Sequence, residues 1–177
     1  NIDVGGAAQF GDDAETITNM RLGTIAFSAN SQGSTSAVVP EMALLGLPFL
    51  FQNLDQAEAV MDGPVGDKIE AAAEAQGLVV LAWWNNGIRE VSNSKGPIAT
   101  PADLAGMKIR TPPDPMTIDI FTALGASPTP MAFSELYIAL QQGVVDGQEN
   151  PLINIYSSKL HEVQPFISMT AHKYEIG

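Results

Sequence analysis

Two arginines are the residues of this sequence best suited to binding a small acid. The chain has three arginines, and two of them, Arg89 and Arg110, lie in segments with the composition of β-strands. A guanidinium presents five donors in a planar fork and can hold a carboxylate through two parallel hydrogen bonds, which a lysine cannot do. We expect the two arginines near the ends of neighbouring strands, where together they could bind an organic anion.

An internal ion pair is the alternative for both arginines. A buried guanidinium needs a partner, because an unpaired charge is costly to remove from water. The sequence supplies several acidic candidates for that role: Glu41, Glu90, Asp103, Asp146 and Glu149. From the sequence alone, both roles stay open for Arg89 and for Arg110.

A second candidate binding element lies between residues 125 and 151. Ser134 can cap a short helix that Gly143 ends. Asn150 and Pro151 then predict a helix start, with Asn150 as the N-cap and Pro151 as the first helical residue. The free backbone N–H groups of such a start, with the Asn150 amide, suit an anion or a polar oxygen. The alternative is that Asn150 only caps its own helix.

Aromatic and small polar residues flank the predicted ligand loops. Phe133, Trp83 and Trp84 are the aromatic candidates, although aromatic residues belong more often to the core, and we expect Trp83 there. Asn30 and Ser31 open a polar loop after a predicted strand, a position where open α/β sheets carry ligand loops. Loops of this composition that bind nothing are equally common, so the loop identifies no ligand by itself.

The composition argues against several classes of partner. The chain of 177 residues has 20 acidic and 8 basic residues and a net charge of −12, so its field repels nucleic acids and anionic membrane surfaces. It has no cysteine, which excludes a disulfide scaffold and thiolate zinc sites. No apolar run approaches the length that crosses a bilayer. We therefore expect no nucleic-acid partner.

The sequence lacks the motifs of catalysis and cofactor binding. His161 and His172 join no cluster with the spacing of metal ligands. The serine-rich stretch 28–36 has no nucleophile-elbow glycines, and no Gly-rich phosphate or dinucleotide loop is present. Asp146 and Glu149 could form a catalytic pair, but their place in a predicted turn favours capping and ion pairing. We expect a protein that is not an enzyme and uses no cofactor or metal.

The elements that must position these residues follow an α/β pattern. In the first half, strands predicted at 24–29 and 78–84 alternate with helices, and the continuous apolar run at 78–84 indicates a strand buried on both faces. In the second half we predict strands at 88–92, 107–111 and 166–171. Helices between strands indicate mostly parallel sheets.

A change in character near Asn85 divides the chain. We expect one α/β lobe over residues 1–85 and a second over residues 86–177, with the last strand crossing between them. Residues 1–4 and 174–177 have the composition of strand ends, so we expect both lobes to be incomplete at the ends of this chain.

Several stretches resemble the solute-binding proteins of TRAP (tripartite ATP-independent periplasmic) transporters, the DctP-like family. The similarity runs along almost the entire chain rather than through one motif. The stretches that carry it are EMALLGLPFLF at 41–51, NGIR at 86–89 with SNSK at 92–95, AGMKIRTP at 105–112 and GASPTPMAFSELYIALQQGVVDGQENP at 125–151.

This resemblance implies a periplasmic protein of two hinged α/β lobes that closes on an organic acid and delivers it to a membrane permease. We expect it to be a monomer. By the same resemblance, Arg110 grips the ligand carboxylate, and the other ligand contacts come from six residues: Arg89, Asn150, Phe133, Asn30, Ser31 and Trp84. Short dicarboxylates and sugar acids such as uronates both fit. The polar loop at 30–34 and the paired tryptophans favour a hydroxylated acid.

Two other functions suit a two-lobe α/β chain. One is the effector-binding domain of a transcriptional regulator, which a helix-turn-helix upstream of the chain would indicate. The other is an enzyme acting on an organic acid, which turnover of the bound ligand would reveal.

Overall fold

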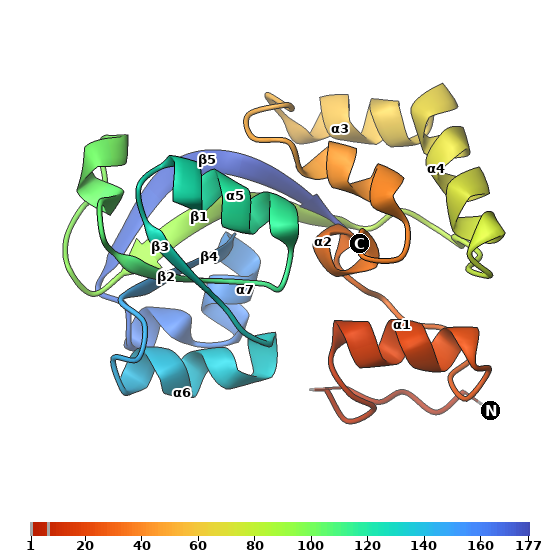
Figure 1. Ribbon diagram of the computed structural model, residues 1–177, viewed down its shortest axis with the longest axis horizontal. Coiled ribbons are helices and arrows are strands. Elements are labelled where there is room, and N and C mark those ends of the chain that lie inside the picture. Colours follow the sequence, from red (N-terminus) through yellow and green to blue (C-terminus); the bar gives the residue numbers. More distant parts are fainter. Residues whose placement is uncertain (1, 7) are drawn as a thin grey trace.

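A five-stranded mixed sheet organises the second half of the chain. The computed structural model describes residues 2–6 and 8–177 (Figure 1). The strand order is β3-β2-β4-β1-β5. Strand β1 pairs antiparallel with β4 and β5, whereas β2 pairs parallel with β3 and β4, so only β1 runs against the other strands. The strands are β1 (Asn85–Asn93), β2 (Lys108–Thr111), β3 (Ser127–Pro130), β4 (Gly147–Pro151) and β5 (Phe166–Ile176).

Helices surround this sheet on both faces and extend from one end of it. In Figure 1, α5 is drawn across β1 and β5, α6 and α7 lie below the strands, and α1 to α4 lie to the right of the sheet. None of the helices in residues 2–6 and 8–177 has the length and apolar character needed to cross a bilayer. The helices are α1 (Asp13–Arg21), α2 (Gln32–Thr35), α3 (Leu54–Met61), α4 (Pro64–Ala75), α5 (Pro115–Ala123), α6 (Leu136–Gln141) and α7 (Leu152–Ser157), with 3-10 turns η1 (Pro40–Gly46), η2 (Pro101–Leu104), η3 (Phe133–Glu135) and η4 (Leu160–Glu162).

Two helix starts follow their local sequence, whereas the predicted capping role of Ser134 is wrong, because Glu135 is the N-cap of α6 and no side chain caps that helix. Asp12 caps α1 in a capping box with Glu15, and Asp114 caps α5 by accepting from the N–H groups of Met116 and Thr117. Gly143 follows α6 with a positive φ of 68°, a conformation that suits glycine. These caps place α5 and α6 on either side of the strand that carries Arg110.

Three apolar clusters form the core of the described residues. One cluster lies between the sheet and α5 around Ile109 and Phe121, and another lies beneath α6 and α7. The third gathers residues of η1, α3 and α4 around Tyr174 and Ile176, at the end of β5. The end of β5 therefore pairs with β1 in the sheet and is also buried against the helical region.

The prediction of strands at 24–29 and 78–84 is wrong, because neither segment forms a strand in the described part of the chain. Leu78 and Val80 pack against the helical cluster, whereas Val79 and Leu81 are 69% and 79% exposed. One face of this run is therefore buried, not two. A strand needs a paired backbone as well as apolar side chains. The predicted α/β class with mostly parallel strands is confirmed in the second half.

Strands β3 and β4 lie where a loop, a turn and a helix start were predicted. Asn150 lies inside β4, 3% exposed, and Pro151 rather than Asn150 occupies the N-cap position of α7. The predicted capping role of Asn150 is therefore wrong. Its neighbours on β4, Gln148 and Glu149, are fully buried as well, and this row of polar residues concealed the strand from pattern analysis.

Candidate functional site

Strand β4 lies between the two arginine-bearing strands. Arg89 on β1 stands opposite Pro151, and Arg110 on β2 stands opposite Gln148. The prediction that the two arginine-bearing strands are neighbours is therefore wrong, because β4 separates them. Both arginines are buried, at 3% and 2% exposure, so each guanidinium needs a group that offsets the cost of removing its charge from water.

The Arg110 guanidinium has no carboxylate partner among the described residues. Its Nε and Nη2 both donate to the carbonyl oxygen of Met131, at 3.0 and 2.7 Å. Of its five N–H donors, the other three have no hydrogen-bond partner in residues 2–6 and 8–177. The described residues therefore show no internal ion pair for Arg110.

Burial lowers the pKa of Arg110 to about 10, and the positive charge of Arg89 adds to that effect. The carboxylates of Glu149, Asp13 and Glu135 act in the opposite direction without outweighing burial. The group remains protonated at neutral pH. A guanidinium whose charged form is disfavoured by burial gains most when an anion comes into contact with it.

Phe133 lies beside this guanidinium. Its ring centre is 5.8 Å from Cζ of Arg110, within the range of a cation–π contact, and the side chain is 42% exposed. Phe133 opens η3, two residues after the Met131 carbonyl that accepts from Arg110. The same short segment therefore fixes the guanidinium and presents an aromatic surface next to it.

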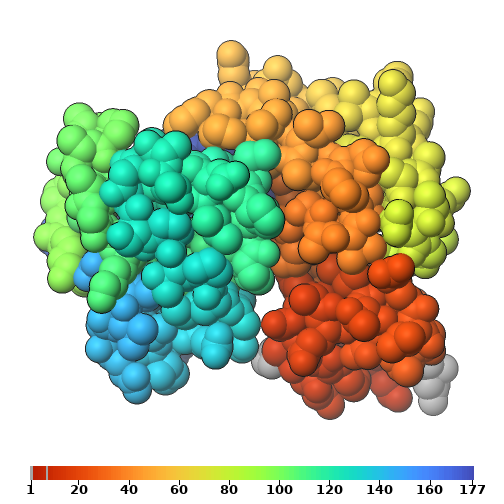
Figure 2. Space-filling view, viewed as in Figure 1, coloured from red at the N-terminus to blue at the C-terminus, as the bar shows by residue number. Residues whose placement is uncertain are grey.

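A furrow separates this segment from the N-terminal part of the chain. In Figure 2 the region around residues 125–145, coloured teal to light blue, faces the red N-terminal region across a narrow gap. Asp13 at the start of α1 and Glu135 in η3 both act on the charge of Arg110, so α1 and η3 both lie near it. Ser31 belongs to the α1 side, because its N–H and Oγ donate to Asp13 Oδ2 at 3.3 and 3.0 Å.

Arg89 shows the internal ion pair instead. Its Nη2 donates to Glu149 Oε1 at 2.7 Å and to the Glu149 carbonyl oxygen at 2.8 Å, and its Nε pairs with Glu149 Oε2. Its Nη1 donates to Glu175 Oε2 at 3.0 Å. Burial alone would lower the pKa of Arg89, but Glu149 and Glu175 outweigh it and raise the pKa above its ordinary value. Glu149 was one of the partners that the sequence supplied.

The ionic cluster continues beyond Arg89. His172 Nε2 lies 3.3 Å from Glu149 Oε2, and Lys173 Nζ donates to Asp114 Oδ2 at 2.7 Å. Burial would raise the pKa of Glu149, yet Arg89 and His172 hold it at about 2. Sequence reasoning missed His172 and Lys173 as members of this cluster, because only the pairing of β5 with β1 brings them beside Arg89, with Lys173 opposite Arg89.

The remaining predicted ligand residues, Asn150, Asn30 and Trp84, lie in different surroundings. Asn150 Oδ1 accepts from Arg89 at 3.2 Å and its Nδ2 donates to Gln148 Oε1 at 2.6 Å, so its amide serves the cluster. Asn30 Oδ1 accepts from Thr16 Oγ1 at 2.9 Å and thereby ties its loop to α1. The Trp84 side chain is 72% exposed, and its backbone pairs with Gly177.

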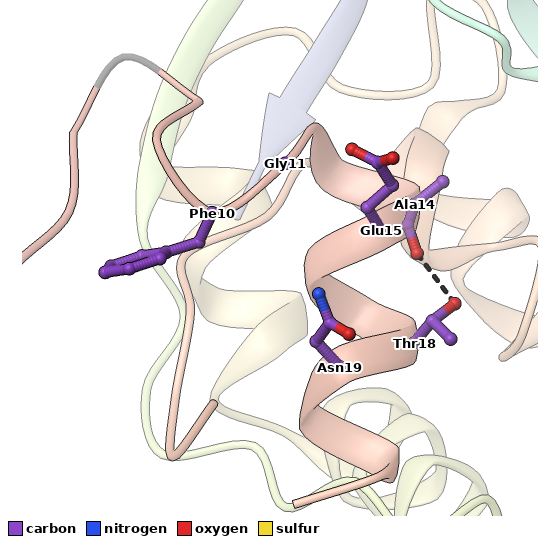
Figure 3. Close-up of a pocket in the computed structure, with 6 residues that line it drawn as sticks. All are labelled: Phe10, Gly11, Ala14, Glu15, Thr18 and Asn19. Carbon is purple, nitrogen blue, oxygen red and sulfur yellow. Dashed lines mark hydrogen bonds between the residues drawn. The ribbon is translucent and has the colours of Figure 1, made fainter. Parts of the chain in front are cut away.

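A wide hollow of about 530 Å³ lies on α1 and involves neither arginine. In Figure 3, Phe10 projects from the loop before α1, and Glu15 and Asn19 lie along the helix. The Thr18 hydroxyl there is already used, since it donates to the Ala14 carbonyl oxygen at 2.9 Å. The described residues that line this hollow include no cation, so the Arg110 environment is the stronger candidate site for an anion.

A comparison with protein families identifies the chain. Residues 1–176 match the family model DctP, described as bacterial extracellular solute-binding protein, family 7. The chain belongs to the DctP family. The predicted family is thereby confirmed, and it is a family of solute-binding proteins rather than of enzymes.

Relatives of this DctP-family chain are longer proteins. An uncharacterised protein of Sinorhizobium fredii, y4mM, is 60% identical over 98% of the chain and 32% of its own length. The 2,3-diketo-L-gulonate-binding periplasmic protein YiaO of Escherichia coli is 44% identical over 93% of the chain and 50% of its own length. A TRAP periplasmic solute-binding protein from a Polaromonas species, bound to D-erythronate, superposes with a TM-score of 0.93 at 43% identity, covering 96% of the chain and 56% of that protein. The chain thus spans about half the length or less of these relatives.

Proposed function

We propose that this chain is part of an extracytoplasmic solute-binding protein of a TRAP transporter, in which Arg110 binds the carboxylate of a small organic acid. One observation carries the proposal. The Arg110 guanidinium is 2% exposed, donates only to a carbonyl oxygen and lacks a carboxylate partner among the described residues. An organic acid would supply the missing negative charge through two charge-assisted hydrogen bonds.

The residues around Arg110 have distinct roles in this proposal. Phe133 packs against the carbon skeleton of the acid, and the α1 side of the furrow, with Ser31 and Asn30, closes over the polar groups of the ligand. Arg89 and Asn150 act as positioning residues, since their polar groups are used within the cluster that fixes β4. Trp84 has an exposed side chain whose contact with a ligand depends on closure of residues 1–85 onto residues 86–177.

The ligand class we favour is a hydroxylated acid. YiaO is named for 2,3-diketo-L-gulonate, and the Polaromonas protein is bound to D-erythronate, and both compounds are carboxylic acids with several oxygen substituents. Ser31, Asn30 and Asp13 offer hydroxyl, amide and carboxylate groups on the facing side of the furrow, which suit hydroxyl groups better than a second carboxylate. A short dicarboxylate is the alternative.

We also propose where the complete protein acts and with which partner. The complete protein is periplasmic and monomeric, releases the acid unchanged to its membrane permease, and catalyses no reaction. The match of residues 1–176 to an extracellular solute-binding family supports this role over that of an effector domain in a transcriptional regulator.

Removing Arg110 tests the proposal. Titration calorimetry with D-erythronate, 2,3-diketo-L-gulonate, uronates and succinate would first identify the ligand. We expect Arg110→Ala to weaken binding by about 3–5 kcal/mol, or more than 100-fold, because the buried carboxylate loses its counter-charge. Arg110→Lys keeps the charge but loses the fork and should recover only part of the affinity.

Arg21 provides the matched control. It is exposed and donates from Nε to the Gln76 carbonyl oxygen at 3.2 Å. Arg21→Ala removes the same charge from the same acidic chain, so we expect binding close to that of the unmodified protein. Equal affinity of Arg110→Ala and Arg21→Ala would contradict the proposal.

A further inference from the structure

A second polar pocket lies where α3 meets the start of β1 and the end of β5. Its volume is about 150 Å³, and it involves no residue of the Arg110 site. The groups that line it include two carboxylates, an amide, a phenol and an indole, from Glu58, Asp62, Asn85, Tyr174 and Trp83. The lining is thus rich in oxygen atoms and carries net negative charge.

The fold brings these groups together from three elements. Glu58 and Asp62 lie four residues apart at the end of α3 and therefore share one helix face. Asn85 begins β1 opposite Ile176, and Tyr174 precedes Ile176 by two residues on β5, which places it on the same face. Figure 1 shows α3 beside the ends of these two strands.

The two carboxylates are unfavourably placed as the structure stands. Like charges four residues apart on a helix repel one another. Asp62 is also the C-cap residue of α3, at the end of the helix where the macrodipole disfavours negative charge. Both unfavourable terms would be relieved by a positive ion held between Glu58 and Asp62.

Two neutral oxygens at the same pocket lack partners. Tyr174 is 4% exposed, and its Oη accepts and donates no hydrogen bond among the described residues. Asn85 Oδ1 is in the same condition, although its Nδ2 lies 3.5 Å from Glu58 Oε1. Buried oxygens without protein partners are rare and need an explanation, such as a bound water molecule or ion.

We propose that this pocket is a binding site for a hard divalent cation of the Ca²⁺ type. Ca²⁺ prefers carboxylate and amide oxygens completed by water, which matches Glu58, Asp62 and Asn85, with Tyr174 binding through a coordinated water molecule. The indole N–H of Trp83 is not free to bond the oxygens of this pocket, because it donates to Glu70 Oε1 at 2.9 Å. No group of three or more His, Cys, Asp or Glu side chains suited to a metal occurs in the described part of the chain. With two charged ligands, the site should bind with a Kd of about 10⁻⁴ to 10⁻³ M.

Calcium titration of the purified protein at fixed ionic strength tests this proposal. We expect one saturable Ca²⁺ site, at least ten-fold weaker binding in Glu58→Gln and in Asp62→Asn, and a smaller loss in Tyr174→Phe. Glu74→Gln is the matched control, because Glu74 lies on α4 outside the pocket and its loss changes the net charge equally. Arg110→Ala should keep the Ca²⁺ site, so failure of the acid-binding proposal would not affect this one.

Terbium luminescence locates the ion independently. Tb³⁺ occupies Ca²⁺ sites and is sensitised by nearby aromatic rings, so emission excited selectively through tryptophan should fall sharply in Trp83→Phe and persist in Trp84→Phe. Two results would overturn the proposal. One is equal Ca²⁺ binding by Glu58→Gln and Glu74→Gln, which would reveal diffuse attraction to an acidic protein. The other is the absence of saturable binding up to about 10 mM, well above the expected Kd.

Discussion

Arg89 and Arg110 are buried to nearly the same extent, yet the two regions around them differ in every other respect. Arg89 is held by two carboxylates, a carbonyl and an amide in the centre of the sheet. Arg110, two strands away, meets one carbonyl oxygen and an aromatic ring. Their pKa values move in opposite directions, upward for Arg89 and downward for Arg110.

In our proposal, the partner of a buried charge, and not its burial, separates the structural Arg89 from the ligand-binding Arg110. The free energy that the Arg89 cluster supplies is already present in the folded protein. The interaction that Arg110 lacks can be made only when an anion arrives. We therefore expect changes at Arg89 to appear mainly in stability and changes at Arg110 mainly in affinity.

The largest test of this contrast is Arg89→Met. Removing the guanidinium leaves Glu149 and Glu175 buried without their main counter-charge, so we expect a loss of about 3–5 kcal/mol in the free energy of unfolding, measured by urea denaturation. Lys95→Met is the control, since the Lys95–Asp146 pair spans 3.1 Å with the lysine side chain 58% exposed, and its loss should cost less than about 1 kcal/mol. Equal losses in the two variants would remove the structural role assigned to Arg89.

Acid pH offers a second test of the same cluster. Arg89 and His172, against the effect of burial, lower the pKa of Glu149 from 4.5 to about 2. The folded protein therefore binds this proton less readily than the unfolded chain, so the stabilisation is complete above pH 4.5 and is lost as the pH falls towards 2. The loss amounts to about 3 kcal/mol, at 1.36 kcal/mol for each pKa unit.

Unfolding free energies measured between pH 6 and pH 2.5 would show this term. Asp114, whose pKa is also lowered because the pull of Lys173 outweighs burial, adds to it in the same direction. A Glu149→Gln variant has no carboxylate to titrate there, so its stability should fall less steeply across this range. Parallel pH profiles for the variant and the unmodified protein would contradict the assignment.

The sequence predicted the elements that local chemistry dictates. Gly143 ends a helix where its conformational preference predicts, and the strand that carries Arg110, Lys108–Thr111, lies within the predicted segment 107–111. The alternation of predicted helices with apolar strand segments gave the prediction of the α/β class. These features depend on a few neighbouring residues, which is why pattern analysis recovers them.

Long-range pairing accounts for what the sequence did not predict. The apolar run at 78–84 has the composition of a buried strand but forms none, whereas the polar residues of β4 form a central strand because Ser92, Arg89 and one another satisfy their side chains. Gly147 lies in β4, where a Cβ atom would lie 2.6 Å from the Ser92 carbonyl oxygen, so the glycine allows a close approach of strands.

The candidate site shows the same division. The choice between ion pair and ligand contact for Arg89 and Arg110 depended on where Glu149 lies, and register rather than composition decides that. With Glu149 on β4 opposite Val91, its carboxylate reaches Arg89 and leaves Arg110 without a carboxylate partner among the described residues. No spacing rule within the sequence contains this register, because the two strands are joined by more than fifty residues.

The smallest test concerns the aromatic side of the Arg110 region. Phe133→Leu keeps an apolar side chain but removes the ring that faces the guanidinium at 5.8 Å. We expect ligand affinity to fall about two- to five-fold, which corresponds to a cation–π contribution of about 0.5–1 kcal/mol, with little change in stability because Phe133 is 42% exposed. Phe10→Leu, at a residue 46% exposed beside α1, is the control and should leave affinity unchanged. If Phe133→Leu lowered stability and left affinity intact, the ring would belong to the core of η3 and α6, and the contrast between the two arginine regions would reduce to the carboxylates alone.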